Sequence, residues 1–244
     1  MRQSLNTRKG RFVFVLCAAV VVVFVCPSSH VRAQKVDRAK LETAARRAGK
    51  AAKVIADLSA LPPAETIPKE LMEKARAVAV FPDTDKVNML TMKFWKGFGL
   101  VSRRVEGGWS TPAFYAFAVS DIGWTRVKSD EPGIIMLFMN DEIFEKDRVK
   151  LEGSEGPVGE WTPEKERNVK GAGIILYSLS EGRLRGISVE DDNSTQAGVN
   201  SDNNVNKAVY GLKAREVLSG KTPAGPPVPP EVTNFQTALA NLWK

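Results

Sequence analysis

Apolar residues follow two different spacings along the chain. Between residues 35 and 61 they recur every three or four positions, whereas between residues 77 and 189 they form short runs separated by turn residues. The first spacing predicts a long amphipathic helix over residues 35–61, which ends where Leu61 precedes two prolines. The apolar stripe of this helix consists of Leu41, Ala44, Ala48, Ala51, Ile55 and Leu58. Pro68 predicts the start of a second, short helix, because proline is favoured in the first helical turn.

The short apolar runs predict β-strands. The predicted strands cover residues 77–81, 87–95, 109–119, 133–140, 173–180 and 184–189. Residues 134–139 are all apolar, which predicts burial on both faces of the sheet. Glu181 and Gly182 predict a hairpin turn between the last two strands. The polar or charge-dense segments 141–150, 160–170 and 191–206 are predicted to be solvated connections.

The C-terminal region returns to helical spacing. Residues 212–218 predict a helix closed by Ser219 and Gly220, and the proline-rich residues 223–230 predict an extended linker. Residues 233–243 predict a last amphipathic helix, with Phe235 and Leu239 on its apolar face. The predicted fold class is therefore α+β: a mainly antiparallel, barrel-like curled sheet with a long N-terminal helix and a C-terminal helix.

The N-terminus has the pattern of an export signal. Four basic residues, Arg2, Arg8, Lys9 and Arg11, precede an unbroken apolar run over residues 12–25. This run is shorter than the roughly 20 residues that a membrane-spanning helix needs, so it predicts a secretory signal. Small residues around Val31 and Ala33 place the cleavage site after Ala33.

Cleavage would leave a single domain over residues 34–244, made of a helical segment 34–61, a sheet core 77–190 and the linker 223–230. The expected location is therefore periplasmic or secreted. Two alternatives stay open. The signal could be retained as a membrane anchor, or a lipid could be attached at Cys26, although Phe24 and Val25 stand where small residues are preferred.

Removal of the signal limits the chemistry that remains. Cys17, Cys26 and His30 all lie within it, so residues 34–244 contain neither cysteine nor histidine. Disulfides, cysteine nucleophiles, histidine-based triads and zinc or haem ligation through these residues are excluded in the mature chain. Residues 220–222 resemble the end of a P-loop, but Arg215 occupies the place of the required glycine. We therefore predict no cofactor and no enzyme, with a carboxylate- or metal-dependent hydrolase as a remaining alternative.

Positive charge is concentrated in two segments. Five of the 35 basic residues leave with the signal, so 30 remain against 28 acidic residues, which is not the balance of a nucleic-acid-binding protein. Residues 34–60 nevertheless have a net charge of +4, and residues 86–104 have five basic residues and no acidic one. Basic amphipathic helices bind anionic membrane surfaces, and aromatic residues beside lysines suit the lipid interface.

These two segments supply the candidate lipid-binding residues. They are Arg46, Arg47, Lys50 and Lys53 in the predicted helix and Lys86, Lys93, Trp95, Lys96, Arg103 and Arg104 in the second segment. The expected mechanism is electrostatic attraction followed by insertion of Trp95 or of apolar residues of the helix. The alternative interpretation is that the alanine-rich stripe docks on the sheet and that the aromatic residues belong to the core.

The order of several short motifs resembles a known family. The motifs include Trp109-Ser110-Thr111-Pro112, Gly156-Pro157-Val158-Gly159, Tyr177-Ser178-Leu179-Ser180 and Tyr210-Gly211, followed by the helix that contains Phe235. In this order they are similar to the SYLF-domain family of lipid-binding and actin-regulating proteins, in its bacterial exported form. The resemblance covers nearly all of residues 34–244.

The resemblance implies a non-enzymatic domain that binds phosphoinositides or other anionic lipids through an N-terminal amphipathic helix, here residues 35–61. The chain departs from the family pattern at residues 88–92 and 119–123, which are poor in glycine, and at Glu160, where an arginine is common. These departures concern lipid selectivity. An actin role is not expected of an exported protein. The expected partner is anionic membrane lipid, with an envelope protein partner as the alternative.

Overall fold

The computed structural model describes residues 37–88, 93–120, 124–125, 133–189, 197–221, 223 and 227–242. The predicted signal and the cleavage site after Ala33 lie outside the described residues, as do residues 191–196 of the predicted polar loop and part of the proline-rich linker. From residue 37 onward the described residues form one compact unit. No helix within these ranges is long and apolar enough to cross a membrane.

The long N-terminal helix is confirmed as α1 (Arg38–Ser59). It begins at Asp37, whose side chain accepts a hydrogen bond from the backbone N–H of Lys40 at 3.2 Å and so satisfies one of the open donors of the first turn. The other helices are η1 (Pro63–Glu65), α2 (Lys69–Lys74), α3 (Glu142–Glu145), α4 (Pro163–Asn168), α5 (Asn203–Tyr210), α6 (Ala214–Leu218) and α7 (Pro230–Asn241).

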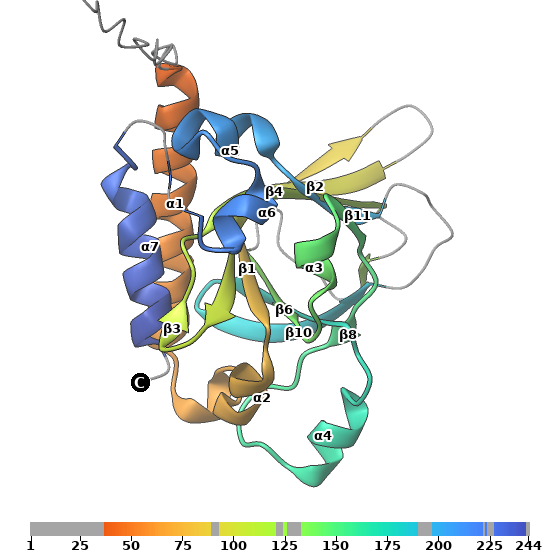
Figure 1. Cartoon of the computed structure of the whole chain (residues 1–244). Helices are drawn as coiled ribbons and strands as arrows, with labels where there is room; N and C mark the ends of the chain where they lie inside the picture. The colour runs from red at the N-terminus through yellow and green to blue at the C-terminus, as the bar shows by residue number, and fades with distance from the viewer. Residues whose placement is uncertain are drawn as a thin grey trace, which may run out of the picture. The chain divides into compact units, whose positions relative to one another are not determined.

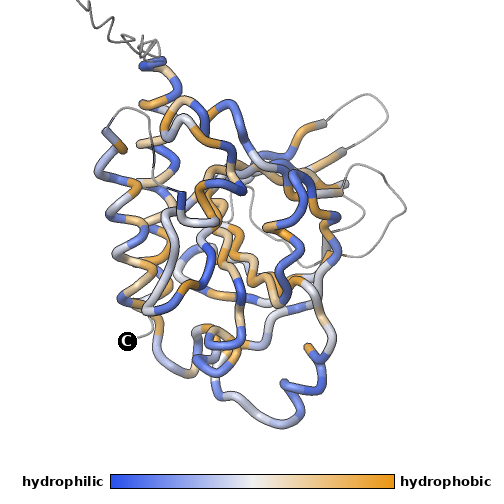
Figure 2. Tube along the Cα trace, viewed as in Figure 1, coloured by the Kyte–Doolittle hydropathy of each residue, from blue (hydrophilic) through white to orange (hydrophobic). Residues whose placement is uncertain are grey.

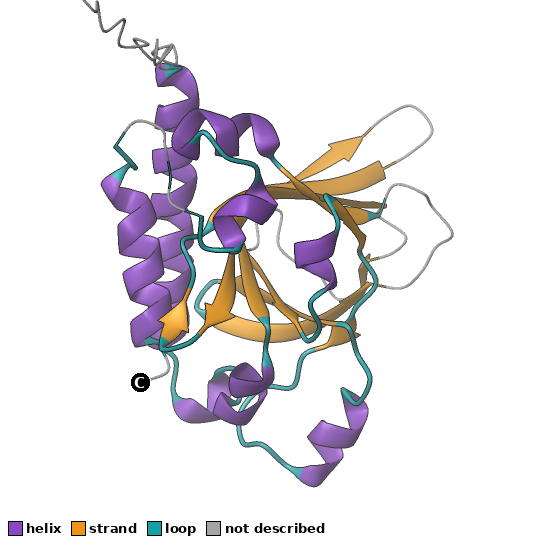
Figure 3. Cartoon of the chain, in the orientation of Figure 1, coloured by secondary structure: helices purple, strands orange, loops and turns teal. Residues whose placement is uncertain are grey.

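The strands form one curled, mostly antiparallel sheet (Figure 3). They are β1 (Ala77–Asn88), β2 (Lys93–Val105), β3 (Gly108–Trp109), β4 (Ala113–Ser120), β5 (Trp124–Thr125), β6 (Gly133–Phe138), β7 (Arg148–Lys150), β8 (Ser154–Glu155), β9 (Ile174–Ser180), β10 (Arg183–Val189) and β11 (Gly198–Ser201). The main order is β5-β10-β9-β6-β1-β2-β4-β11-β7, while β3 pairs with β2 and β8 runs parallel to β9. The predicted fold class is confirmed.

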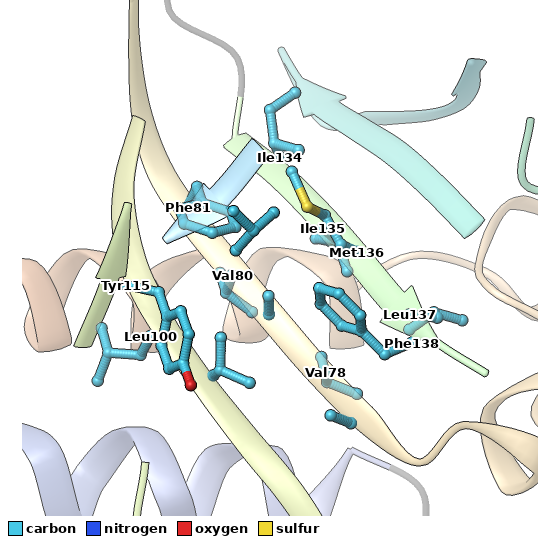
Figure 4. Packing of buried hydrophobic residues seen from close by; sticks show 14 of the residues in the cluster. Val78, Val80, Phe81, Leu100, Tyr115, Ile134, Ile135, Met136, Leu137 and Phe138 are labelled. Carbon is cyan, nitrogen blue, oxygen red and sulfur yellow. The ribbon is translucent and has the colours of Figure 1, made fainter. Parts of the chain in front are cut away.

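Helices α1 and α7 lie side by side against the sheet (Figure 1). The alanine-rich stripe of α1 is buried there except at Leu41, which is partly buried, and its small side chains allow close approach to the neighbouring elements. Every residue of β6 is buried, as the unbroken apolar run predicts. Apolar side chains of β1, β2, β4 and β6 pack together in the core (Figure 4). The hydropathy of the chain follows this arrangement, with the central strands apolar and α4 hydrophilic (Figure 2).

Several predicted boundaries are wrong. Residues 87–95 do not form one strand, because residues 87 and 88 end β1 and β2 begins at residue 93. Three segments that were predicted as connections contain regular elements. Residues 141–150 contain α3 and β7, residues 160–170 contain α4, and residues 191–206 contain β11 and the start of α5. These elements are short, and α3 and β7 each bury one residue while α4 buries none, so they lack the apolar spacing that identifies longer elements. The predicted hairpin turn is confirmed, with φ of 52° at Glu181 and 71° at Gly182.

The motifs behind the family resemblance are structural. The Tyr177 hydroxyl donates a hydrogen bond to the carbonyl of Pro157 at 3.0 Å, and a Cβ on Gly156 would lie 2.1 Å from the Tyr177 ring. Glycine is therefore required at position 156 for this crossing of the chain over β9. In the same way, the Tyr210 hydroxyl donates to the carbonyl of Pro112 at 2.6 Å. These two tyrosines therefore tie distant segments of the chain together.

Candidate functional site

A cleft of about 410 Å³ lies between α1 and the hairpin formed by β1 and β2. It is lined by Arg46, Arg47 and Lys50 from α1 and by Asp83, Asp85 and Phe98 from the hairpin. We call this the α1–hairpin cleft. Positions 46 and 50 are one helical turn apart and share the solvent-facing flank of α1. The strand register places Asp83 beside Phe98 and Asp85 beside Lys96, so these side chains share one face of the hairpin.

Carboxylates pair with most of the cations around this cleft. Lys50 hydrogen-bonds Asp83, the guanidinium of Arg47 contacts Asp202 at 2.8 Å, and Lys96 lies 3.9 Å from Asp85. Lys53, one turn further along α1, pairs with Asp57 at 2.8 Å. Arg46 is exposed and has no ion-pair partner among the described residues. The charge counts along the sequence predicted two segments of net positive charge. In the fold, aspartates lie next to most of the lysines and arginines of these segments, so much of that charge is paired.

Phe98 gives the cleft an apolar component. The Arg47 guanidinium lies 4.4 Å from the centroid of the Phe98 ring, an arrangement in which the ring face attracts the cation. The ring is still 38% exposed, and within the described residues it and Val105 are the large apolar side chains that face solvent. The cleft thus combines cations, carboxylates that pair with them and one accessible aromatic ring.

Trp95 and Lys86 lie on the opposite face of the hairpin. They pair across the strands, and the Lys86 ammonium is 5.4 Å from the centroid of the Trp95 ring. Trp95 is only 6% exposed. The expected insertion of Trp95 into lipid is therefore wrong for this conformation, because its ring is already covered by protein. The same holds for the apolar stripe of α1, which is buried against the sheet and α7.

Arg103 and Arg104 lie at the far end of β2 and do not join the cleft. Arg104 donates hydrogen bonds to the carbonyls of Met72 at 2.7 Å and Ala75 at 3.0 Å, so it caps the C-terminal end of α2. Burial lowers the pKa of the Arg104 guanidinium from its usual value. Arg103 lies over the Phe144 ring at 4.3 Å and 3.9 Å from Asp141. Both arginines stabilise the fold locally.

Of the ten predicted residues, the cleft brings together Arg46, Arg47 and Lys50. Lys96 lies beside the lining residue Asp85, whereas Lys53 pairs with Asp57 of its own helix and does not line the cleft. The backbone of Lys93 begins β2, but its side chain lies outside the described part. Sequence reasoning missed Phe98 and the aspartates. The spacing of Asp83 and Asp85 could have placed them on one strand face, whereas Asp202 comes from a distant segment that no local pattern connects to α1. Within the described residues, no group of three or more His, Cys, Asp or Glu side chains could hold a metal ion.

These features define an α+β domain in which a long N-terminal helix presents a mixed-charge flank beside a curled sheet. Residues 133–242 match the model of the Ysc84 family, described as Las17-binding protein actin regulator. The predicted resemblance to the SYLF-domain family is thereby confirmed over this segment, which runs from β6 into α7. The residues that line the cleft belong to α1 and to the β1–β2 hairpin, which precede the matched segment. Asp202, the partner of Arg47, lies within the matched segment. The searches of curated proteins and of solved structures found no match.

Proposed function

We propose that the chain is an exported, non-enzymatic module that associates peripherally with anionic phospholipid through the α1–hairpin cleft. The observation that carries this proposal is the position of the exposed Arg46 and Lys50 on one flank of α1, in the same cleft as the accessible ring of Phe98 and the half-buried Arg47. The family resemblance supports the same ligand class, with phosphoinositide-type lipids as the family's ligands.

The proposed mechanism uses ion-pair exchange instead of helix insertion. Exposed ion pairs contribute only about 0–1 kcal/mol, so a lipid phosphate can replace Asp83 as the partner of Lys50. Arg46 binds a phosphate without losing a protein partner. Each basic residue near an anionic membrane contributes about 1 kcal/mol, which makes binding moderate and sensitive to salt. Phe98 adds apolar contact at the interface, while α1 stays docked on the sheet.

Charge reversal on the outer flank of α1 tests this surface. The double variant Arg46→Glu/Lys50→Glu should bind vesicles of phosphatidylcholine with phosphatidylglycerol at least about tenfold more weakly, because two attractive contacts become repulsive. Arg183→Glu/Arg185→Glu reverses two exposed arginines on β10 and is the matched control, because it changes the overall charge by the same amount. Equal losses in both proteins would show that overall charge, and not the cleft, governs binding.

The second candidate is a protein-interaction scaffold of the cell envelope. The matched family is described by the binding of a protein, Las17, and a cleft with interspersed cations and carboxylates also suits a charged protein surface. Vesicle binding and affinity capture from envelope extracts distinguish the two candidates. A stoichiometric protein captured by the parent chain and lost with Arg46→Glu/Lys50→Glu, together with no vesicle binding, would favour the scaffold.

A further inference from the structure

A second pocket lies between α2 and α4, at the end of the sheet where both helices project (Figure 1). It has a volume of about 520 Å³, within the roughly 300–1,000 Å³ of small-molecule sites. Its lining comes from α2, from the end of β6 and from the segment that leads through α4 towards β9. None of its lining residues contributes to the α1–hairpin cleft.

The floor of this pocket is apolar. Leu71 and Val169 are buried beneath it, while Met139, Trp161 and Ala172 are half-buried and line the accessible wall. Methionine adapts its shape to irregular ligands, and the tryptophan offers a broad flat surface. The floor therefore fits the aliphatic or aromatic body of a small molecule.

The rim carries an excess of positive charge. Lys74 pairs with Glu166, and its ammonium lies 5.2 Å from the centroid of the Trp161 ring. Arg167 and Lys170 also line the pocket, and no carboxylate contacts either of them within the described ranges. Glu166 also interacts electrostatically with Lys170, so Lys74, Arg167 and Lys170 share one carboxylate at this rim. This net positive charge beside an apolar floor is complementary to a molecule with an anionic end and an apolar body.

Backbone contacts hold the walls of the pocket in place. The Thr162 side chain accepts a hydrogen bond from the N–H of Lys165 at 3.3 Å and caps α4. The Lys165 ammonium donates to the carbonyls of Val158 at 2.8 Å and Glu160 at 2.6 Å. The N–H of Gly159 donates to the carbonyl of Thr66 at 2.8 Å, which ties this segment to the connection between η1 and α2. The pocket is thus formed before a ligand arrives, which lowers the entropic cost of binding.

We infer that this α2–α4 pocket binds a small amphipathic anion, with its carboxylate or phosphate on Arg167 and Lys170 and its apolar body against Trp161 and Met139. The inference is independent of the proposed membrane association, because it involves different residues and a soluble ligand.

Dodecanoate, used as a monomer below its micelle concentration, is the probe for this site. Titration calorimetry on the parent chain should show saturable binding of one molecule. Acetate, which lacks the apolar body, and dodecyltrimethylammonium, which carries the opposite charge, should not bind. The variant Arg167→Ala/Lys170→Ala should weaken dodecanoate binding about tenfold or more, because charged hydrogen bonds are lost.

A fluorescence readout locates the ligand independently of affinity. Dodecanoate should change the intrinsic tryptophan emission of the parent chain, and this change should disappear in Trp161→Phe, which keeps an apolar ring at the floor. The variant Arg46→Glu is the control: it should weaken vesicle binding and leave dodecanoate binding unchanged. Equal binding of the cationic amphiphile, no binding of dodecanoate, or no effect of Arg167→Ala/Lys170→Ala would overturn the inference.

Discussion

Arg47 of α1 contacts Asp202 at 2.8 Å, and the other oxygen of the same carboxylate caps α5 by accepting from the N–H of Val205 at 3.3 Å. One half-buried carboxylate therefore joins the N-terminal helix to an element far along the chain. Arg47 also lies over Phe98. This arginine has a structural role that the neighbouring Arg46, without an ion-pair partner among the described residues, does not share.

The two adjacent arginines should consequently differ in their effect on stability. Arg47→Ala should lower the free energy of unfolding by about 1–2 kcal/mol, since it removes a partly buried charged hydrogen bond. Arg46→Ala should change it by less than about 0.5 kcal/mol, as expected of an exposed residue. Denaturant unfolding of the two variants measures the difference, and equal destabilisation would refute the structural role of the pair.

Asn206 is predicted to be among the most sensitive polar positions. Its side chain is fully buried, accepts from the N–H of Phe114 at 2.9 Å and donates to the carbonyl of Phe114 at 2.8 Å. Asn206→Ala would leave a buried N–H of β4 without a partner, at a cost of about 2–4 kcal/mol in the free energy of unfolding. Asn204→Ala, on the exposed side of the same helix, is the control and should be nearly neutral.

The three tyrosines predict how the protein responds to alkaline pH. Tyr115, Tyr177 and Tyr210 are all fully buried, and burial raises the pKa of each phenol above its usual value. Because the pKa is higher in the folded state, the stability contribution is complete below the unfolded value of about 10 and is lost as the pH rises above it.

Phenolate absorbance should therefore appear together with loss of the folded circular dichroism signal, in one cooperative transition above about pH 10. Phenolate formation near pH 10 in a protein that keeps its folded signal would contradict the burial of these side chains.

Within the described residues, the Tyr115 hydroxyl has no hydrogen-bond partner, whereas that of Tyr210 donates to Pro112. Tyr115→Phe should accordingly destabilise the protein less than Tyr210→Phe.

The sequence predicted those parts of the fold that have a strong local pattern. The spacing of Ala44, Ala48 and Ala51 identified α1, and the apolar run through Ile135 identified a strand buried on both faces. Short elements such as α4 were missed because their sequence is dominated by exposed charges. Their formation depends on tertiary contacts, including the pairing of Lys74 with Glu166, that spacing alone does not show.

The candidate site was predicted less completely than the fold. Arg46, Arg47 and Lys50 share a helical flank, so their proximity followed from the sequence. The cover over Trp95 and the hydrogen bonds of Arg104 to α2 did not follow from the sequence, because alternation along a strand places a side chain on one of two faces without showing which face the protein covers. The pairing of Arg47 with Asp202 required the tertiary fold.

Co-sedimentation with phospholipid vesicles tests the central claim most directly. Residues 34–244, which contain the compact unit, would be mixed with neutral or anionic vesicles at low and at high salt concentration. The proposal predicts that the protein pellets with anionic vesicles only and that high salt weakens this binding, because the contacts are electrostatic and exposed. Equal binding to neutral vesicles, binding that molar salt leaves unchanged, or no binding to anionic vesicles at low salt would contradict it.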